Sequence, residues 1–222
     1  MSSVNQKYTF QYSQPEDYHF SHDSVFLAQF VFDWLQKNTD YKINQMADLC
    51  AGCGIIGMDL LLHLNQNKMS LPAQADFIED QNVYESHFEK NKIELEKILN
   101  QKSEIHFISA NYADLLVDSK FKSKYDLIFC NPPYFKTTQG KLSPSEFKNR
   151  CRFFIDSDFS NLLKFLKHSL SKNGVALLLL RSLADHNDDW GLDVLSDELD
   201  LAVQTVGHIR GTDVVLIRYS NK

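Results

Sequence analysis

The sequence lacks the features of a membrane-spanning or secreted protein. Its longest apolar run, residues 175–180, is far shorter than the about 20 residues that cross a bilayer. The first residues are polar and contain no basic stretch followed by an apolar one, so we expect no secretory signal. Repeats and low-complexity tracts are also missing. We therefore expect a cytoplasmic protein with no membrane attachment.

Cysteine is scarce, with four residues in 222. That number is ordinary for an intracellular protein, and a chain of this length buries enough apolar surface to fold without disulfides or a metal. Cys50 and Cys53 have the Cys-x-x-Cys spacing of some redox and zinc sites. A single pair supplies only two ligands, and both cysteines lie inside a glycine-rich turn. We therefore expect no metal site.

Positive charge is in deficit, since 23 Lys and Arg face 29 Asp and Glu, giving a net charge of −6. This argues against a broad basic face for nucleic acid. The charge is unevenly distributed, however. Residues 135–152 carry a net +4, which leaves −10 for the remainder, and the segment is either a solvated loop or a phosphate-binding one. Its basic residues are Lys136, Lys141, Lys148, Arg150 and Arg152.

Short β-rich apolar runs alternate with helical periodicity along the chain, which predicts a mostly parallel α/β sheet with helices on both faces. The length fits one domain better than two. The last two runs flank a short turn, which predicts an antiparallel hairpin at one sheet edge. The expected strands are 43–49, 75–78, 105–108, 125–130, 175–180, 201–209 and 214–219, and the expected helices are 23–37, 55–64, 81–99 and 158–170.

A glycine-rich turn at residues 48–57 follows the first expected strand and opens a helix. Glycine lets the chain turn sharply and lets the backbone approach a ligand at the helix N-terminus. Gly52, Gly54 and Gly57 also fit the G-x-G-x-x-G pattern of dinucleotide enzymes. Against an NAD enzyme, Asp48 would repel a pyrophosphate but can hold a cationic amino group. The chain is also short for a dinucleotide domain plus a catalytic domain.

Two further strand ends carry polar residues suited to a nucleoside. Glu79 ends the second expected strand, where its carboxylate can accept hydrogen bonds from both hydroxyl groups of a ribose. Asn111, beside Tyr112, follows the third expected strand and can bond an adenine edge.

The fourth expected strand ends in the most specific motif of the chain, Asn131-Pro132-Pro133-Tyr134. Two prolines fix the backbone and remove two amide donors, which leaves carbonyl groups as acceptors, and the Asn131 side chain adds another. Two acceptors can hold a planar NH2 group by both hydrogens and make its delocalised nitrogen more nucleophilic. Tyr134 can stack on the flat group. The four residues therefore predict catalysis on a planar amino group, which has no role in hydride transfer.

Together these residues resemble the class I S-adenosylmethionine-dependent methyltransferases that carry Asn-Pro-Pro-Tyr, which include N6-adenine and N5-glutamine enzymes. The resemblance covers about residues 18–220 and implies a single Rossmann-like domain that binds S-adenosylmethionine through the glycine turn and Glu79. At position 50 this chain has cysteine where glycine is commoner. The candidate cofactor-binding residues are Asp23, Asp48, Cys50, Ala51, Gly52, Gly54, Glu79, Asn111 and Tyr112.

Residues 18–28, 131–136 and 140–144 match one branch of that family more closely, the tRNA(Val) adenine-N6 methyltransferases. This resemblance implies tRNA as partner and an adenine just 3′ of the anticodon as target. Where the family usually reads Ala-Arg-His-Glu, this chain reads Asn149-Arg150-Cys151-Arg152-Phe153. The connection 135–157 is then the expected substrate loop. The candidate substrate-binding residues are Phe135, Lys136, Lys141, Lys148, Arg150 and Arg152.

The same resemblance divides the chain into an N-terminal segment, 1–42, whose helix packs on the cofactor site, and a methyltransferase domain, 43–222, which form one structural unit. Two other functions stay open. A protein glutamine-N5 methyltransferase would use the same motif, but release-factor members carry a helical domain for which 42 residues leave little room. A catalytically inactive RNA- or protein-binding module would not need the intact glycine turn and complete motif. The sequence predicts no oligomeric state.

Overall fold

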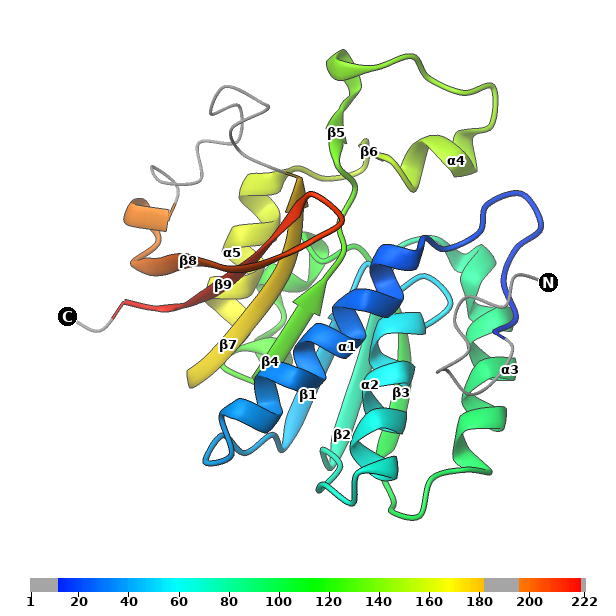
Figure 1. Cartoon of the computed structure of the whole chain (residues 1–222). Helices are drawn as coiled ribbons and strands as arrows, with labels where there is room; N and C mark the ends of the chain where they lie inside the picture. The colour runs from blue at the N-terminus through cyan, green and yellow to red at the C-terminus, as the bar shows by residue number, and fades with distance from the viewer. Residues whose placement is uncertain (1–11, 182–195, 221–222) are drawn as a thin grey trace.

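The computed structural model describes residues 12–181 and 196–220, and its centre is a seven-stranded sheet (Figure 1). The strands are β1 (Gln45–Leu49), β2 (Gln74–Glu79), β3 (Glu104–Ser109), β4 (Tyr125–Cys130), β7 (Leu170–Arg181), β8 (Leu201–Ile209) and β9 (Thr212–Tyr219). They lie in the order β3-β2-β1-β4-β7-β9-β8. The first five in this order run parallel, and β9 and β8 form the antiparallel edge. The predicted mostly parallel sheet with an edge hairpin is confirmed.

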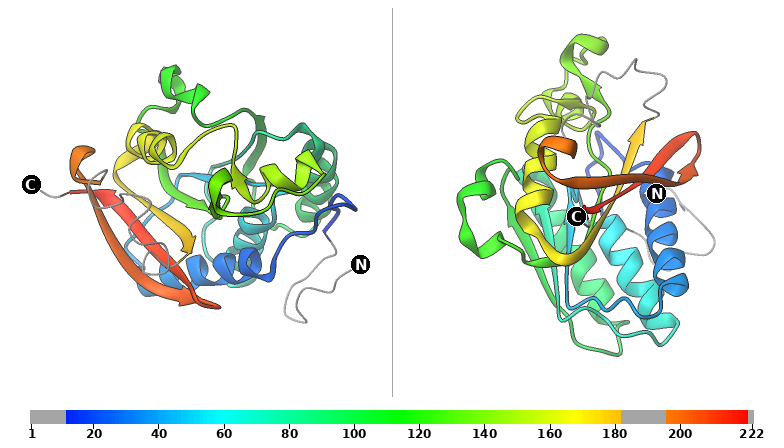
Figure 2. Two further views of the ribbon diagram at one scale, coloured as in Figure 1. Left: turned by 90° about the horizontal axis from the view of Figure 1, so that it is seen from above. Right: turned by 90° about the vertical axis from the view of Figure 1, so that its left-hand side faces the viewer.

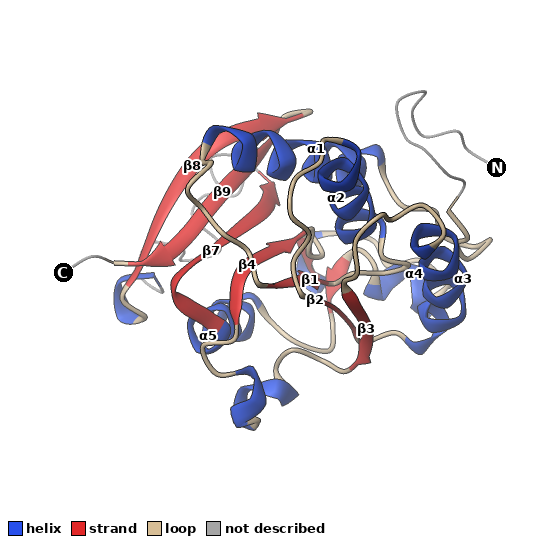
Figure 3. Ribbon diagram, turned by 90° about the horizontal axis from the view of Figure 1, so that it is seen from below, coloured by secondary structure: helices blue, strands red, loops and turns tan. Residues whose placement is uncertain are grey.

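Helices cover both faces of the sheet, as predicted (Figure 3). The α-helices are α1 (His22–Lys37), α2 (Ile55–Gln66), α3 (Glu85–Glu96), α4 (Glu146–Arg150) and α5 (Phe159–Ser169), and the 3-10 helices are η1 (Asn82–Tyr84), η2 (Asp114–Val117), η3 (Ser119–Phe121) and η4 (Thr137–Gln139). Helices α1, α2 and α3 pack on one face and α5 on the other. Within the described ranges, no helix is long and apolar enough to span a bilayer.

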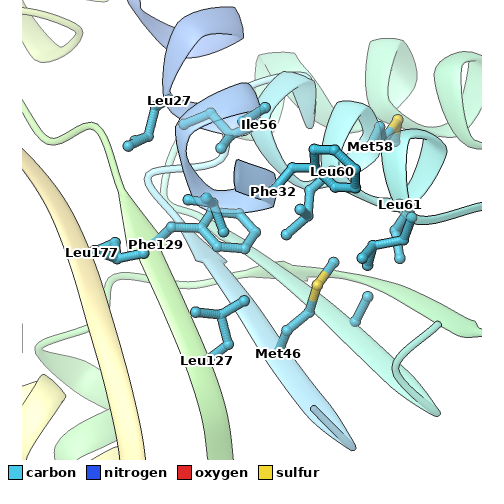
Figure 4. Close-up of a cluster of buried hydrophobic side chains, with 14 of the residues drawn as sticks. Leu27, Phe32, Met46, Ile56, Met58, Leu60, Leu61, Leu127, Phe129 and Leu177 are labelled. Carbon is cyan, nitrogen blue, oxygen red and sulfur yellow. The ribbon is translucent and has the colours of Figure 1, made fainter. Parts of the chain in front are cut away.

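The side chains of β4 point alternately to the two faces of the sheet and so contribute to two hydrophobic cores. Leu127 and Phe129 point into the first core, where they meet Leu27 of α1 and Met46 of β1 (Figure 4). Ile128 points the other way, into the core beneath α5. All five side chains are fully buried. Successive strand residues face opposite sides of a sheet, so a strand covered by helices on both faces is apolar throughout.

Several element boundaries differ from the sequence prediction, and the helix expected at 81–99 is divided into η1 and the shorter α3. Strand β7 begins at Leu170, directly after α5, whereas the polar residues Ser171 to Gly174 predicted a loop before residue 175. This stretch stays extended because Leu170 pairs with Tyr125, with a register irregularity before residue 175. The hairpin turn is also shorter than expected, since β9 begins at Thr212. Only Arg210 and Gly211 remain in the turn, both at positive φ, as in a type I′ hairpin.

Residues 135–157, which we call the arm, are more ordered than the predicted loop. Strands β5 (Phe135–Lys136) and β6 (Phe153–Phe154) pair in parallel and form a separate two-stranded sheet, with α4 between them in the chain. Figure 2 shows the arm lying over the edge of the main sheet where β4 ends. The predicted segments 1–42 and 43–222 extend beyond the described residues, into 1–11, 182–195 and 221–222.

Candidate functional site

A cavity of about 260 Å3 lies at the carboxyl ends of β1, β2, β3 and β4. Its walls come from the first turn of α1, the glycine turn, the residues after β2 and β3, the Asn-Pro-Pro-Tyr motif and the arm. Parallel strands bring these distant segments to one edge of the sheet. Seven predicted cofactor-binding residues line this cavity, namely Asp23, Cys50, Ala51, Gly52, Glu79, Asn111 and Tyr112. All four predicted catalytic residues line it too, as do Phe135, Arg150 and Arg152.

The glycine turn has a backbone conformation that glycine favours. Gly52 and Gly54 have φ of +54° and +87°. A Cβ on Gly54 would lie 2.8 Å from Met58 Cε, so this residue fits the helix packing and does not line the cavity. Cys50 also has a positive φ, +56°, although it carries a side chain. The turn therefore keeps its left-handed conformation even at a position that holds no glycine.

Glu79 ties the end of β2 to the glycine turn. Its Oε2 accepts a hydrogen bond from Gly52 N, and its Oε1 accepts one from Gln81 N, both at 2.9 Å. Burial raises the pKa of Glu79 to about 7, while the two backbone N–H groups oppose that rise. The carboxyl group at this cavity wall therefore changes its charge near neutral pH.

The two predicted aspartates lie in different surroundings. Asp48 is fully buried, its Oδ2 accepts a hydrogen bond from Gly57 N at 2.9 Å, and it does not line the cavity. Burial raises the pKa of Asp48 well above its ordinary range. Asp23 lines the cavity, and its Oδ1 lies 3.4 Å from Nη1 of Arg210 in the hairpin turn. Asp48 thus fixes the glycine turn against α2, and Asp23 presents a carboxylate to the cavity.

The Asn131 side chain is held at both ends of its amide. Its Nδ2 donates to Ser24 Oγ at 3.1 Å, and its Oδ1 accepts from the Tyr134 hydroxyl at 2.6 Å. Burial raises the pKa of Tyr134 above its ordinary value, so the phenol keeps its proton at neutral pH. Asn131 follows Cys130, which is the register partner of Leu49 in β1. The pairing of β1 with β4 therefore brings the motif beside the glycine turn.

The basic segment of the arm does not act as one patch. Arg150 pairs with two carboxylates, those of Glu146 at 3.1 Å and Asp156 at 3.3 Å. Lys141 is exposed and Lys148 is half-buried, and neither lines the cavity. Lys136 also lies outside the cavity lining. The predicted substrate-binding residues are therefore divided between the cavity wall and the outer surface of the arm.

Arg152 lies beside two neighbouring aromatic rings of the arm. Its guanidinium carbon is 5.9 Å from the centre of the Phe135 ring and 5.7 Å from that of Phe153. These distances are in the range of cation–π contacts. Because Phe135 and Phe153 are register partners in β5 and β6, Arg152 sits where the arm meets the cavity.

Several cavity residues were not predicted from the sequence. The Tyr84 hydroxyl lies 3.3 Å from Cys151 Sγ, and Gln81 Nε2 lies 3.5 Å from the same sulfur. The Phe147 ring of α4 also lies 5.5 Å from the Tyr84 ring. These contacts dock the arm on the segment after β2. Their signal in the sequence was the position of Gln81 and Tyr84 directly after the acidic strand end.

Comparison with known proteins identifies the fold. No family model matches the sequence, and no curated protein matches it. Among solved structures, the chain is similar to the ribosomal protein L11 methylase of Lactobacillus delbrueckii subsp. bulgaricus, with a TM-score of 0.59, 14% identity, and coverage of 91% of this chain and 81% of that chain. It is also similar to a putative methyltransferase of Escherichia coli, with a TM-score of 0.56, 13% identity, and coverage of 95% of this chain and 92% of that chain. A putative RNA methyltransferase of Pyrococcus horikoshii is similar too, with a TM-score of 0.54, 14% identity, and coverage of 90% of this chain and 83% of that chain. This chain has the class I methyltransferase fold.

The four cysteines of this chain are free thiols. Cys53 is buried, and burial raises its pKa to about 12, so it is a poor thiolate nucleophile or ligand at neutral pH. Within residues 12–181 and 196–220, no three His, Cys, Asp or Glu side chains gather into a group that could hold a metal.

Proposed function

We propose that this chain is an S-adenosylmethionine-dependent methyltransferase that methylates the N6 amino group of an adenine in RNA, with tRNA as the substrate. The observation that carries the proposal is that Glu79 and Asn131 line the same cavity in a class I methyltransferase fold. One side chain suits a ribose and the other suits a planar amino group. A tRNA substrate also implies a protein that works in the cytoplasm.

The cavity residues fit S-adenosylmethionine. Gly52 presents backbone without a Cβ, Glu79 presents a carboxyl group for the ribose hydroxyls, and Tyr112 gives an apolar wall near Asn111 for the adenine ring. We assign the cationic amino group of the cofactor to Asp23, because Asp23 lines the cavity and the buried Asp48 does not. The bound cofactor supplies an electrophilic methyl group.

The motif residues suit the acceptor amine. Asn131 Oδ1 has two lone pairs, of which the Tyr134 hydroxyl uses one, so the other can accept a hydrogen from the adenine NH2. A backbone carbonyl of the proline pair, which offers no N–H donor, can accept the second hydrogen. When both N–H groups of the amine donate hydrogen bonds to these acceptors, the electron density on N6 increases and its lone pair is oriented. This stabilisation grows as the nitrogen becomes positive in the transition state.

The test is methyl transfer by the purified protein. Unmodified tRNA would be incubated with S-adenosylmethionine and digested, and the nucleosides separated by mass spectrometry. We expect N6-methyladenosine that depends on both enzyme and cofactor. A parallel incubation contains a glutamine peptide from a release factor. Methylation of that glutamine without methylation of RNA would replace this proposal with the protein methyltransferase, and tRNA binding without any methyl transfer would indicate an inactive binding module.

A further inference from the structure

We infer that Ser24, in the first turn of α1, is a positioning residue that sets which end of the Asn131 amide faces the acceptor amine. The inference rests on the proposed function and adds a residue outside the Asn-Pro-Pro-Tyr motif. Ser24 Oγ accepts the hydrogen bond from Asn131 Nδ2 at 3.1 Å, across 107 positions of sequence. Ser24 lines the cavity and is only 8% exposed.

The orientation of the amide matters because its two ends have nearly the same shape and opposite polarity. The oxygen accepts hydrogen bonds, whereas the nitrogen only donates them. Rotation of the Asn131 side chain by half a turn would present N–H groups to the N–H groups of the acceptor amine. That arrangement would repel the substrate amine and remove the acceptor that makes its nitrogen nucleophilic. A productive site therefore needs a contact that holds the Asn131 side chain in one rotamer.

The two hydroxyl groups beside Asn131 differ in donor and acceptor strength, and this difference can select one rotamer. A phenol is more acidic than an aliphatic hydroxyl, and its oxygen shares lone-pair density with the ring, so it is the better donor and the poorer acceptor. The pairing of Tyr134 with Oδ1 and of Ser24 with Nδ2 uses each hydroxyl in its stronger role. Without Ser24, Nδ2 would lose its acceptor in a mostly buried place, and either end of the amide could pair with Tyr134.

The scaffold keeps Ser24 in place. Its neighbour Val25 is 1% exposed, and Leu27, two residues further on, is fully buried in the first core. Phe129 of β4 belongs to the same core, two residues before Asn131. The helix that carries Ser24 and the strand that ends directly before Asn131 are thus joined by packing, which is how rigid elements hold a site precisely.

The kinetic test compares Ser24→Ala with Ser24→Thr, which keeps the hydroxyl group, and with Ser86→Ala, an exposed serine of α3 as control. We expect kcat for adenine methylation to fall about tenfold in Ser24→Ala, the effect of losing one hydrogen bond that acts in the transition state. The KM for RNA, the affinity for S-adenosylhomocysteine and the melting temperature should stay close to those of the wild type. Ser24→Thr should recover most of the rate, and Ser86→Ala should match the wild type.

A second measurement needs no substrate. In 15N-labelled protein, the side-chain NH2 signals of Asn131, assigned by their absence from Asn131→Ala, should shift in Ser24→Ala, while those of Asn65 in α2 stay in place. If the wild type methylates RNA and Ser24→Ala has an unchanged kcat or unshifted Asn131 signals, the inference is overturned and the proposed function stands. If Ser24→Ala instead lowers the rate, the cofactor affinity and the melting temperature together, the inference is overturned and Ser24 has a structural role. A wild type that makes no N6-methyladenosine overturns the proposed function itself, whatever the Asn131 signals do.

Discussion

The Oε2 atom of Glu79 accepts a hydrogen bond from the backbone N–H of Gly52 at 2.9 Å. This bond joins the end of β2 to the glycine turn after β1, so the two segments that line the proposed ribose site are held together before any ligand binds. The other carboxylate oxygen accepts from Gln81 N. Because Glu79 is almost fully buried, its charge depends on these donors and on what enters the cavity.

Affinity for S-adenosylhomocysteine should rise with pH through neutrality. Burial holds the pKa of Glu79 at about 7, and the ionised form is the better acceptor for ribose hydroxyl groups. At pH 6 about a tenth of the free protein carries the ionised form, so affinity should be about tenfold weaker than at pH 8. Calorimetry at pH 6, 7 and 8 measures this. Glu79→Gln should bind weakly at pH 8 and show a flat profile, and an equally steep profile in that variant would assign the titration to another group.

The same group should also affect stability, with the opposite sign. The pKa of Glu79 is higher in the folded protein than its ordinary value of 4.5, so the folded state holds the proton more tightly. Its contribution to the free energy of unfolding is present below pH 4.5 and is lost as pH rises through about 7. Urea unfolding at pH 5 and pH 8 should therefore show a smaller difference in Glu79→Gln than in the wild type. An identical difference in both proteins would contradict the raised pKa.

Asn131→Ala should lose methyl transfer while it keeps cofactor binding. The proposed role of Asn131 is to accept hydrogen from the acceptor amine, chiefly in the transition state, and such groups typically contribute about 10²–10³ in rate. Nucleoside mass spectrometry after timed reactions gives the rate, and calorimetry with S-adenosylhomocysteine gives the affinity. Asn161→Ala, on α5 beneath the opposite sheet face, is the matched control. Full activity in Asn131→Ala would mean that the motif serves only the fold.

Local patterns predicted the sheet well and the side-chain contacts less well. The unbroken apolar run at residues 127–130 is typical of a strand buried on both faces, as β4 is, and the strand ends then place Glu79 and Asn131 at one edge of the sheet. No local pattern reports that Asn131 pairs with Ser24, because that contact depends on how α1 packs against the sheet. The net charge of the arm likewise did not indicate that Arg150 pairs with two carboxylates.

Gly57→Ala should destabilise the protein although alanine favours helices. A Cβ at this position of α2 would lie 2.4 Å from Phe77 Cε1 and 3.2 Å from Asp48 Oδ2. Overpacking of a filled core costs about 1–3 kcal/mol, which exceeds the roughly 1 kcal/mol gained in helix propensity. Urea unfolding measures the change. Gly140→Ala is the control, since among the described residues its Cβ would meet the Phe153 ring alone, at 3.2 Å. Equal stability of both variants would show that the core accommodates the added methyl group without cost.

Binding of tRNA should weaken steeply with salt, although the protein as a whole is acidic. Lys141 and Lys148 of the arm form no ion pair within the described parts of the chain, whereas Arg150 is neutralised by Glu146 and Asp156. Three to five phosphate contacts would give a slope of about −2 to −4 in log affinity against log salt. Filter binding from about 50 to 200 mM salt measures this slope.

The variant that tests this surface is Lys141→Glu with Lys148→Glu, because reversing Arg150 would place a third carboxylate beside two others and damage the arm. We expect tRNA affinity to fall strongly and the salt slope to become shallower by about two contacts, with S-adenosylhomocysteine binding unchanged. The control reverses Lys120 and Lys122, which are exposed and precede β4, at the sheet end away from the cavity. If the arm variant binds and methylates tRNA as the control does, or if wild-type affinity ignores salt, the arm does not hold the phosphate backbone. The glutamine methyltransferase would then be the better hypothesis, because the motif alone does not distinguish an adenine from a glutamine side chain.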